Sequence, residues 1–454
     1  MSNILIKNVK SIVTMNENRE ILEGYSILIK GNKIEKIGKD IDISDEKLDE
    51  IIDGSNCYVY PGLINTHHHF YQTLTRNIPQ AQNVELFDWL KFLYPIWAKV
   101  SPKAVYYSTL VAAGELLKTG CTTSVDHFYV FPKDQPPDLL DNEFNAAKDI
   151  GIRLHASRGS MSLSEKDGGL PPDSVVQTER EILEDSQRVI EKFHDPTVYS
   201  MNRVILAPCS PFSVTKELLE ESIKLARQYN VSSHTHLAET KDEEQFCLDK
   251  FGMRPLEYME SLGWTGPDVW YAHGVHFTEK EIDKLASTKT GVAHCPVSNQ
   301  KLASGAAKIP YMLKKGLRLG LAVDGSASND SSNMILEMKI GFLMNRLIHG
   351  IKSITAEDIL HIATVGGSQL INQPELGSLE EGKAADLFLV NTNRLGYAGG
   401  LYDPISLLIN TGDSQIVDIT IVNGEIVVKQ GQLVNVDERK IIEEANKISK
   451  AMVE

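Results

Sequence analysis

The chain has 454 residues, 42% of them hydrophobic, so it can bury one large barrel with an accessory domain, and disordered or fibrous architectures are excluded. Its 46 Lys and Arg against 61 Asp and Glu give a net charge of −15 without a basic block, which excludes nucleic-acid polymers as partners. No apolar run approaches the roughly 18 residues of a membrane span, and five scattered cysteines without a CxxC pair fit a reducing compartment, so we expect a cytoplasmic protein with free thiols.

The two ends of the chain are predicted to form one small β-sandwich. Residues 1–57 contain short alternating segments rich in β-branched residues, which are typical of strands. Similar signals return only in 375–454, where Asn423-Gly424 is a strong two-residue hairpin signal. We therefore expect both ends to pair in one domain, and a charged amphipathic helix over 438–452 to close the chain.

The middle of the chain, 58–374, alternates short apolar strands with segments of helical period, such as those that begin after Ser101 and Thr215. Eight such β-then-α units match the size of an α/β fold, the parallel (β/α)8 TIM barrel, whose active site lies at the C-terminal strand ends. Long predicted loops at 77–99 and 159–176 are candidates for lids. The predicted strands lie within 59–69, 121–128, 152–159, 203–211, 231–239, 269–277, 290–298 and 317–325.

Most of the 13 histidines fall on or just after the predicted barrel strands. A single histidine in such a place is more often a hydrogen-bonded structural residue than a ligand, but ten at one rim of a barrel favour a metal or catalytic site. The ten are His67, His68, His69, His127, His155, His234, His236, His273, His276 and His294.

The spacing of these histidines is that of a metal site. Because side chains alternate along a strand, His67 and His69 point to the same side and can bind one ion together. The same spacing recurs at His234 and His236, and Asp324 ends the eighth strand, next to the first in a closed barrel. Imidazoles with one carboxylate, and a position left for water, describe a catalytic zinc site, although iron accepts the same ligands.

Several segments carry a specific resemblance to a known family. They are PGLINTHHH at 61–69, HLAE at 236–239, the pair Ala272-His273, Asp324, and GSLEEGKAADL at 377–387. The chain resembles the amidohydrolase superfamily along essentially its whole length, and within it the cytosine deaminase-like branch with one metal. The segments FYQTLTR, FDWL and LYPIW at 70–97 are most similar to 8-oxoguanine deaminases and hydroxydechloroatrazine ethylaminohydrolases, with guanine deaminases also related.

The resemblance implies a role for each site residue. It makes His67, His69, His236 and Asp324 the metal ligands, and Glu239, His273 and Asp324 the catalytic groups. Family members with two metals usually have a bridging Lys after strand four, and no Lys lies in 203–211. We therefore expect a single divalent metal ion, Zn²⁺ or Fe²⁺.

The remaining candidates have structural alternatives. His68 should point away from its neighbours and pack, His127 and His155 should fill space in the barrel mouth, and His234 could support a ligand. His276 and His294 stay open. Glu239 could be a solvated carboxylate at a helix start, but three residues after a candidate ligand we interpret it as a proton donor.

Four further residues are predicted to bind the substrate. Gln72, three residues past His69, could read a ring N–H and a neighbouring carbonyl, the role that the resemblance gives it. Trp97 belongs to an aromatic group with Phe87, Trp89 and Tyr94 that either stacks on a planar ring or packs in the loop core. Arg158 and Cys209 follow strands three and four, where Arg158 could contact a purine and Cys209 would shape the pocket.

These residues predict a metal-dependent hydrolytic deaminase of a 2-amino-4-oxo heterocycle, with 8-oxoguanine, which would give urate and ammonia, as the best single substrate. Guanine, isoxanthopterin or isocytosine, or an alkylamine-releasing reaction on a hydroxytriazine, are alternatives with the same machinery. A barrel without activity and with an assembly role is a different class of hypothesis. We expect a small purine-, pterin- or pyrimidine-like substrate, no nucleic-acid polymer, no membrane, and, by family analogy, a homo-oligomer.

Overall fold

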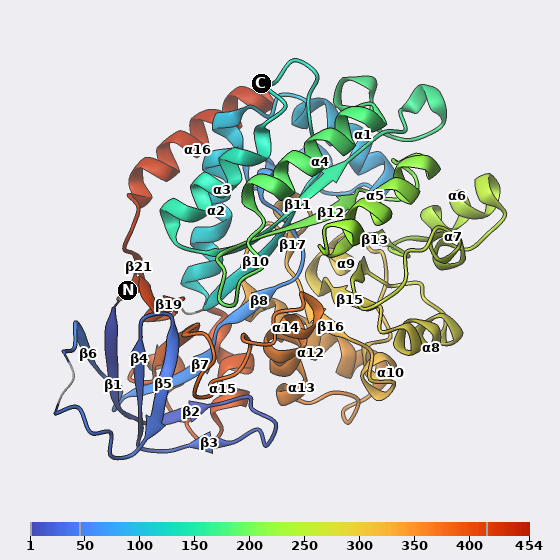
Figure 1. Ribbon diagram of the computed structural model, residues 1–454. Helices are drawn as coiled ribbons and strands as arrows, with labels where there is room; N and C mark the ends of the chain where they lie inside the picture. The colour runs from blue at the N-terminus through green and yellow to red at the C-terminus, as the bar shows by residue number, and fades with distance from the viewer. Residues whose placement is uncertain (1, 45–46, 415) are drawn as a thin grey trace.

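A closed parallel barrel forms the centre of the molecule in the computed structural model, which describes residues 2–44, 47–414 and 416–454 (Figure 1). Its eight strands are hydrogen-bonded in chain order, and the last pairs with the first. The predicted (β/α)8 barrel is therefore confirmed. The strands are β8 (Leu63–Asn65), β10 (Cys121–Phe128), β11 (Arg153–Ser160), β12 (Asn202–Pro208), β13 (Ser233–Leu237), β14 (Val269–His273), β15 (Gly291–His294) and β16 (Leu319–Leu321).

Helices surround the barrel because each buries one apolar face against the strands, whose own side chains are buried on both faces. The predicted caps are present: Ser101 accepts a hydrogen bond from the backbone N–H of Ala104, and Thr215 one from Leu218. The longer helices are α2 (Pro102–Lys118), α3 (Leu139–Ile150), α4 (Glu179–Phe193), α5 (Lys216–Gln228), α6 (Lys241–Phe251), α7 (Pro255–Ser261), α8 (Glu279–Thr288) and α12 (Met334–His349).

Further elements complete the barrel rim and the connections between units. The two at the rim that carry site residues are β9 (His68–His69) and β17 (Asp324–Gly325), which pair in parallel. The others are η1 (Phe70–Thr75), α1 (Leu86–Trp97), α9 (Pro296–Lys301), α10 (Ile309–Lys314), α11 (Ser326–Asn329), α13 (Ala356–His361), α14 (Gly367–Leu370) and α15 (Pro404–Thr411).

Both ends of the chain build a β-sandwich beside the barrel, at the lower left of Figure 1. Strand β18 pairs with β7, so the two ends share one sheet. A layer of buried aliphatic side chains, including Ile4, Ile27, Val59 and Leu387, fills the space between the sheets. One sheet has the order β5 (Lys33–Gly38), β4 (Tyr25–Lys30), β1 (Asn3–Val9), β6 (Glu50–Asp53); the other has β21 (Gln432–Leu433), β20 (Glu425–Lys429), β19 (Ile419–Val422), β18 (Leu387–Asn391), β7 (Cys57–Pro61), β2 (Ser11–Val13), β3 (Ile21–Leu22).

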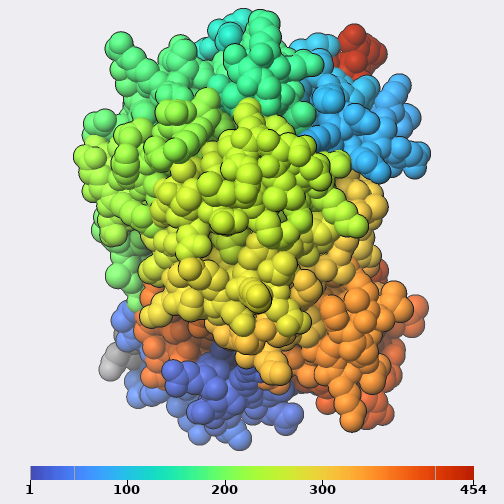
Figure 2. All heavy atoms as spheres, turned by 90° about the vertical axis from the view of Figure 1, so that its right-hand side faces the viewer, coloured from blue at the N-terminus to red at the C-terminus, as the bar shows by residue number. Residues whose placement is uncertain are grey.

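The predicted hairpin joins β19 to β20. Asn423 and Gly424 both have positive φ, 51° and 80°, the conformation that a two-residue turn between twisted strands requires. Figure 2 shows that the two ends of the chain lie together: the blue N-terminal segments are at the base of the molecule, next to orange and red segments of the C-terminal part.

The last helix, α16 (Glu438–Val453), crosses from the sandwich to the barrel and lies along α2 (Figure 1). Lys118 on α2 forms an ion pair with Glu438, and Met452 is buried at the far end. The helix therefore covers the barrel and not the sandwich. No helix among the described residues combines the length and apolarity needed to cross a bilayer.

A buried ion pair joins the barrel to the sandwich. Arg153 on β11 donates from Nε and Nη2 to the carboxylate of Asp386, at 3.1 and 2.9 Å, and neither side chain is more than 3% exposed. Asp386 also accepts the backbone N–H of Asn423 in the hairpin, at 2.6 Å. The two-pronged geometry fixes the angle at which the domains meet.

Replacing Arg153 with Ala leaves the Asp386 charge buried without its main partner. We expect a loss of about 3–5 kcal/mol in the free energy of unfolding, measured by urea denaturation. Arg180→Ala, which removes a solvent-exposed pair with Glu184 on α4, is the control and should change nothing measurable. Equal stability of the two variants would contradict this role for Arg153.

Candidate active site

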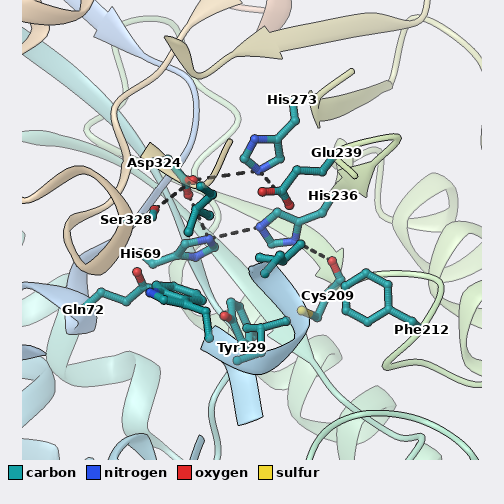
Figure 3. A pocket seen from close by; sticks show the side chains of 14 residues that line it. His69, Gln72, Tyr129, Cys209, Phe212, His236, Glu239, His273, Asp324 and Ser328 are labelled. Carbon is teal, nitrogen blue, oxygen red and sulfur yellow. Dashed lines mark hydrogen bonds and ion pairs between the residues drawn. The ribbon is translucent and has the colours of Figure 1, made fainter. Parts of the chain in front are cut away.

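Imidazoles and one carboxylate meet at the C-terminal rim of the barrel, where Figure 3 shows His69, His236, His273 and Asp324 close together. Nε2 of His69 lies 3.1 Å from Nε2 of His236, and Oδ1 of Asp324 lies 3.2 Å from Nε2 of His67 and 3.3 Å from Nε2 of His69. The pairing of β9 with β17 brings Asp324 beside the two histidines of the first strand. One small volume thus collects residues from the first, fifth and eighth strands.

In His67, His69 and His236, Nδ1, the ring nitrogen that does not face the common centre, contacts a neighbouring group. Nδ1 of His69 and Nδ1 of His236 donate to the backbone carbonyls of His127 and Cys209, at 2.7 and 2.6 Å. Nδ1 of His67 lies 2.7 Å from Nε2 of His234. If Nδ1 carries the proton in all three rings, each Nε2 presents a lone pair to the common centre.

This arrangement fits a divalent metal ion. The Nε2 atom of His67 is buried and has no hydrogen-bond partner among the described residues, which is costly unless a ligand satisfies it. Two sets of side chains have possible ligand atoms within 4.8 Å of one another: His67, His69, His127 and His236, and His67, His236, His273 and Asp324. Because both sets contain His67 and His236, they describe one location. Imidazole nitrogens with a carboxylate oxygen are the donor set of catalytic zinc and iron sites.

Backbone and hydroxyl donors orient Asp324. Its Oδ1 accepts the N–H of Gly325 at 2.7 Å, and its Oδ2 accepts the hydroxyl of Ser298 at 2.6 Å. Asp324 has φ 63°, a left-handed conformation that aspartate adopts only at a cost. Oδ1 therefore faces the imidazoles, and Oδ2 is supported by the turn after β15.

Glu239 and His273 lie beside this centre. Nε2 of His273 is 3.5 Å from Glu239 Oε2 and 3.9 Å from Asp324 Oδ2, while its Nδ1 is bonded to Asn299 Oδ1 at 2.9 Å. Burial, and to a lesser extent the charge of Asp324, raises the pKa of Glu239 well above its ordinary value. This shift favours the protonated form of Glu239, which is the form that a proton donor needs.

A second glutamate, Glu243, fixes the segment that carries Glu239. It is fully buried, and its two oxygens accept the backbone N–H groups of Ala238 and Glu239, at 2.8 and 2.9 Å. Ala238 has φ 54°, a turn that points Glu239 into the site. A carboxylate at the third position of a helix can be recognised in a sequence, and Glu243 holds that position after Thr240. Glu243 was not among the predicted site residues.

A buried acid pair behind His69 was also missed. Asp126 on β10 accepts the backbone N–H of Phe70 at 2.6 Å, directly after the candidate ligand. Burial raises the pKa of Asp126 to about 7 and that of Glu143, which contacts it, well above its ordinary value. Burial therefore favours a protonated form in this pair, and Asp126 holds the start of η1 through the N–H of Phe70.

Two of the predicted substrate residues, Gln72 and Cys209, line the cavity in front of the metal ligands. The cavity is narrow, about 30 Å³, which is room for one or two waters. Gln72 rests against Gly325, where a Cβ would come within 1.9 Å of its Oε1. Helix α1 and nearby loops supply the outer wall, formed by Leu86, Trp89, Leu90, Tyr129, Phe212 and Leu302.

The other two predicted substrate residues do not line this cavity. Arg158 is 1% exposed, donates to Asp185 at 2.6 Å, and stacks on the ring of Phe131. Trp97 is fully buried and donates from Nε1 to the hydroxyl of Thr75 at 3.1 Å. Both side chains are used in packing, so neither can touch a molecule in the cavity without rearrangement.

The remaining histidines lie around the site or away from it. His68 points away and bonds Ser332, His127 bonds the carbonyl of Ala207 and stacks on His236, and His234 supports His67. His155 is bonded to Gln373 and lines a different cavity. His276 bonds the carbonyl of Ser304, and His294 is buried in the barrel.

A parallel barrel with imidazoles, a carboxylate and a buried glutamate at its strand ends defines a hydrolase site of the metal-dependent type. The chain belongs to the amidohydrolase family, whose sequence profile matches residues 58–427. It is therefore an enzyme, as the sequence predicted.

Relatives with known activities cover most of the chain. It is 47% identical to an 8-oxoguanine deaminase of Pseudomonas aeruginosa over 357 residues, 79% of each chain. It is 37% identical to a hydroxydechloroatrazine ethylaminohydrolase of Pseudomonas sp. (strain ADP), across 100% of this chain and 96% of that protein. A zinc complex of an atrazine chlorohydrolase from Arthrobacter aurescens superposes with a TM-score of 0.94, at 31% identity over 98% of this chain and 100% of that chain.

The contact between His234 and His67 has a testable consequence. His234→Ala removes the acceptor that fixes the proton and the angle of the His67 ring, so metal affinity should fall by about 10- to 100-fold, measured by competition with a chelator. His155→Ala, which removes a buried histidine from the neighbouring cavity, should leave metal affinity unchanged. Unaltered affinity in His234→Ala would show that His67 does not need this support.

Proposed function

We propose that the protein is a metal-dependent deaminase that removes the amino group from a 2-amino-4-oxo heterocycle, with 8-oxoguanine as its substrate and urate and ammonia as products. The observation that supports the reaction class is the close approach of His67, His69, His236 and Asp324 beside Glu239, whose pKa burial raises. The 47% identity to an 8-oxoguanine deaminase supports the choice of substrate.

We propose a single zinc ion as the cofactor, held by His67, His69, His236 and Asp324. When bound, such an ion lowers the pKa of water from 15.7 to about 7 and so makes a nucleophile available at neutral pH. Both candidate sets of ligands contain His67 and His236, which supports one ion, and the zinc complex of a structural neighbour supports zinc as that ion.

Asp324 is placed to receive the proton of the attacking water. Its Oδ2 faces His273 Nε2 at 3.9 Å and is held by Ser298, so the carboxylate cannot turn away from the cavity. Because Nδ1 donates to Asn299 Oδ1, the neutral His273 ring presents Nε2 as an acceptor in the gap between the two carboxyls, where it can accept a hydrogen bond from the attacking water.

Glu239 is the proton donor to the leaving side of the substrate. Glu239 gives its proton to the ring nitrogen next to the attacked carbon, which allows the C–N system to accept the oxygen. The proton that Asp324 took from the attacking water then moves to the departing nitrogen and releases ammonia. Burial raises the pKa of Glu239 and so favours its protonated form, and Glu243 holds the backbone so that the acid faces the cavity.

Gln72 is proposed to read the amide-like edge of the ring. A side-chain amide has one acceptor and two donors, which match a ring N–H beside a carbonyl. Its Oε1 is buried without a partner among the described residues, so a ring N–H would satisfy it. Release of an alkylamine from a hydroxytriazine is the second candidate, because the apolar outer wall of Leu86, Leu90 and Leu302 suits an alkyl group and the ethylaminohydrolase matches the whole chain.

Ammonia release tests the substrate class. We expect the purified protein with zinc to deaminate 8-oxoguanine faster than guanine, isoxanthopterin or isocytosine, because a relative at 47% identity is an 8-oxoguanine deaminase. A coupled ammonia assay on this panel measures it, with release of ethylamine from a hydroxytriazine measured in parallel. Turnover of the triazine alone would replace the proposal with the second candidate.

Variants of the two acidic groups should separate proton transfer from metal binding. Glu239→Gln should keep its metal and lose turnover by about 100-fold or more, because the acid is gone while the ligands remain. Asp324→Ala should lose turnover and also retain less metal. Metal analysis measures metal retention, and kcat measures turnover. The control is Glu257→Gln, the same change at an exposed position on α7. Full activity of Glu239→Gln would remove this residue from the mechanism.

A further inference from the structure

One wall of the cavity carries a hydrogen-bond donor that the proposed mechanism does not use. Trp89 lies on α1, is 4% exposed and lines the cavity, yet its indole Nε1–H has no partner among the described residues. Trp97, eight residues further along the same helix, satisfies its own Nε1–H on Thr75. A buried donor without a partner is costly, about 1–3 kcal/mol, so the Trp89 donor points to a ligand.

Two other lining residues carry hydroxyl and thiol groups. Tyr129 and Cys209 line the same cavity. The Tyr129 hydroxyl lies beside that of Tyr71, and the Cys209 thiol beside the hydroxyls of Ser210 and Ser213. This wall therefore offers O–H, S–H and N–H groups and no carboxylate, which is the chemistry that receives an oxygen acceptor.

The position of this wall relates it to one edge of the substrate. In Figure 3, Tyr129 and Cys209 lie on the opposite side of His69 and His236 from Asp324 and Glu239. A planar bicyclic base whose amino-bearing carbon faces Glu239 extends its far ring away from the catalytic carboxyls. In 8-oxoguanine that far ring carries the C8 oxygen, whereas guanine has only hydrogen there.

We propose that Trp89 is a specificity-determining residue, whose indole N–H donates to an oxo group on the substrate edge remote from the attacked carbon. Tyr129 and Cys209 complete the donor wall. The inference rests on the proposed deaminase function and deepens it, because it states why an 8-oxo base is preferred over guanine. A site built to hydrogen-bond a substrate group discriminates strongly against the analogue that lacks it, since its buried donor is then left unpaired.

The test compares two ligands that differ only at that oxygen. For Trp89→Phe we expect kcat/KM with 8-oxoguanine to fall by about 10- to 100-fold, while guanine, measured as a second substrate or as a competitive inhibitor, changes less than about threefold. Trp97→Phe is the matched control: it removes a donor that bonds Thr75 and not the cavity, so the ratio between the two ligands should stay at the parent value. Metal content and circular dichroism confirm that each variant is folded and loaded.

The outcomes separate this inference from the proposed function. If the parent protein deaminates 8-oxoguanine and Trp89→Phe weakens both ligands equally, or neither, the role of the indole N–H is wrong and the deaminase proposal stands. If the parent protein deaminates no oxo-purine, both proposals fall together. A fall in the ratio with Trp97→Phe as large as with Trp89→Phe would likewise overturn the assignment, because the effect would come from packing of α1.

Discussion

The site depends on which nitrogen of each histidine carries the proton. In His67, His69 and His236, Nδ1 is hydrogen-bonded to a neighbouring group, at 2.6 to 2.7 Å. The partner of His67 is His234, and the partners of His69 and His236 are backbone carbonyls. Those bonds fix both the ring angle and the tautomer, so that each Nε2 faces the common centre with a lone pair. A barrel strand is rigid enough to hold such bonds, which is why the ligands lie on strand ends and not on the longer loops.

The same rim stores backbone strain. Ala238, His273 and Asp324 are non-glycine residues with φ of 54°, 73° and 63°. Ala238 directly follows β13, His273 ends β14, and Asp324 begins the short rim strand β17. Each conformation costs free energy and is maintained by local bonds, such as those from Glu243 to residues 238 and 239. The barrel and the buried ion pair between Arg153 and Asp386 make the surrounding structure rigid enough to maintain these turns.

Catalysis and recognition are divided between different parts of the chain. The groups proposed to move protons follow β13, end β14 and begin β17, while much of the outer wall comes from η1 and α1, in the long connection after the first strand. Changes in that connection can alter substrate choice without disturbing the ligands. This division explains how relatives of similar fold act on an oxo-purine in one case and on triazines in others.

The sequence by itself determined the eight strands, the pairing of both chain ends and the residues that could share a metal, because period-two alternation and ligand spacing are local properties of a strand. Only the tertiary structure decided which aromatic residue of α1 faces the cavity. Trp89 and Trp97 are both buried, and hydrophobic periodicity cannot tell a face packed on protein from one that lines a pocket. The sequence could not place Arg158 either: its partner Asp185 lies on α4, and a contact between a strand and a later helix is set by how the helix packs on the barrel.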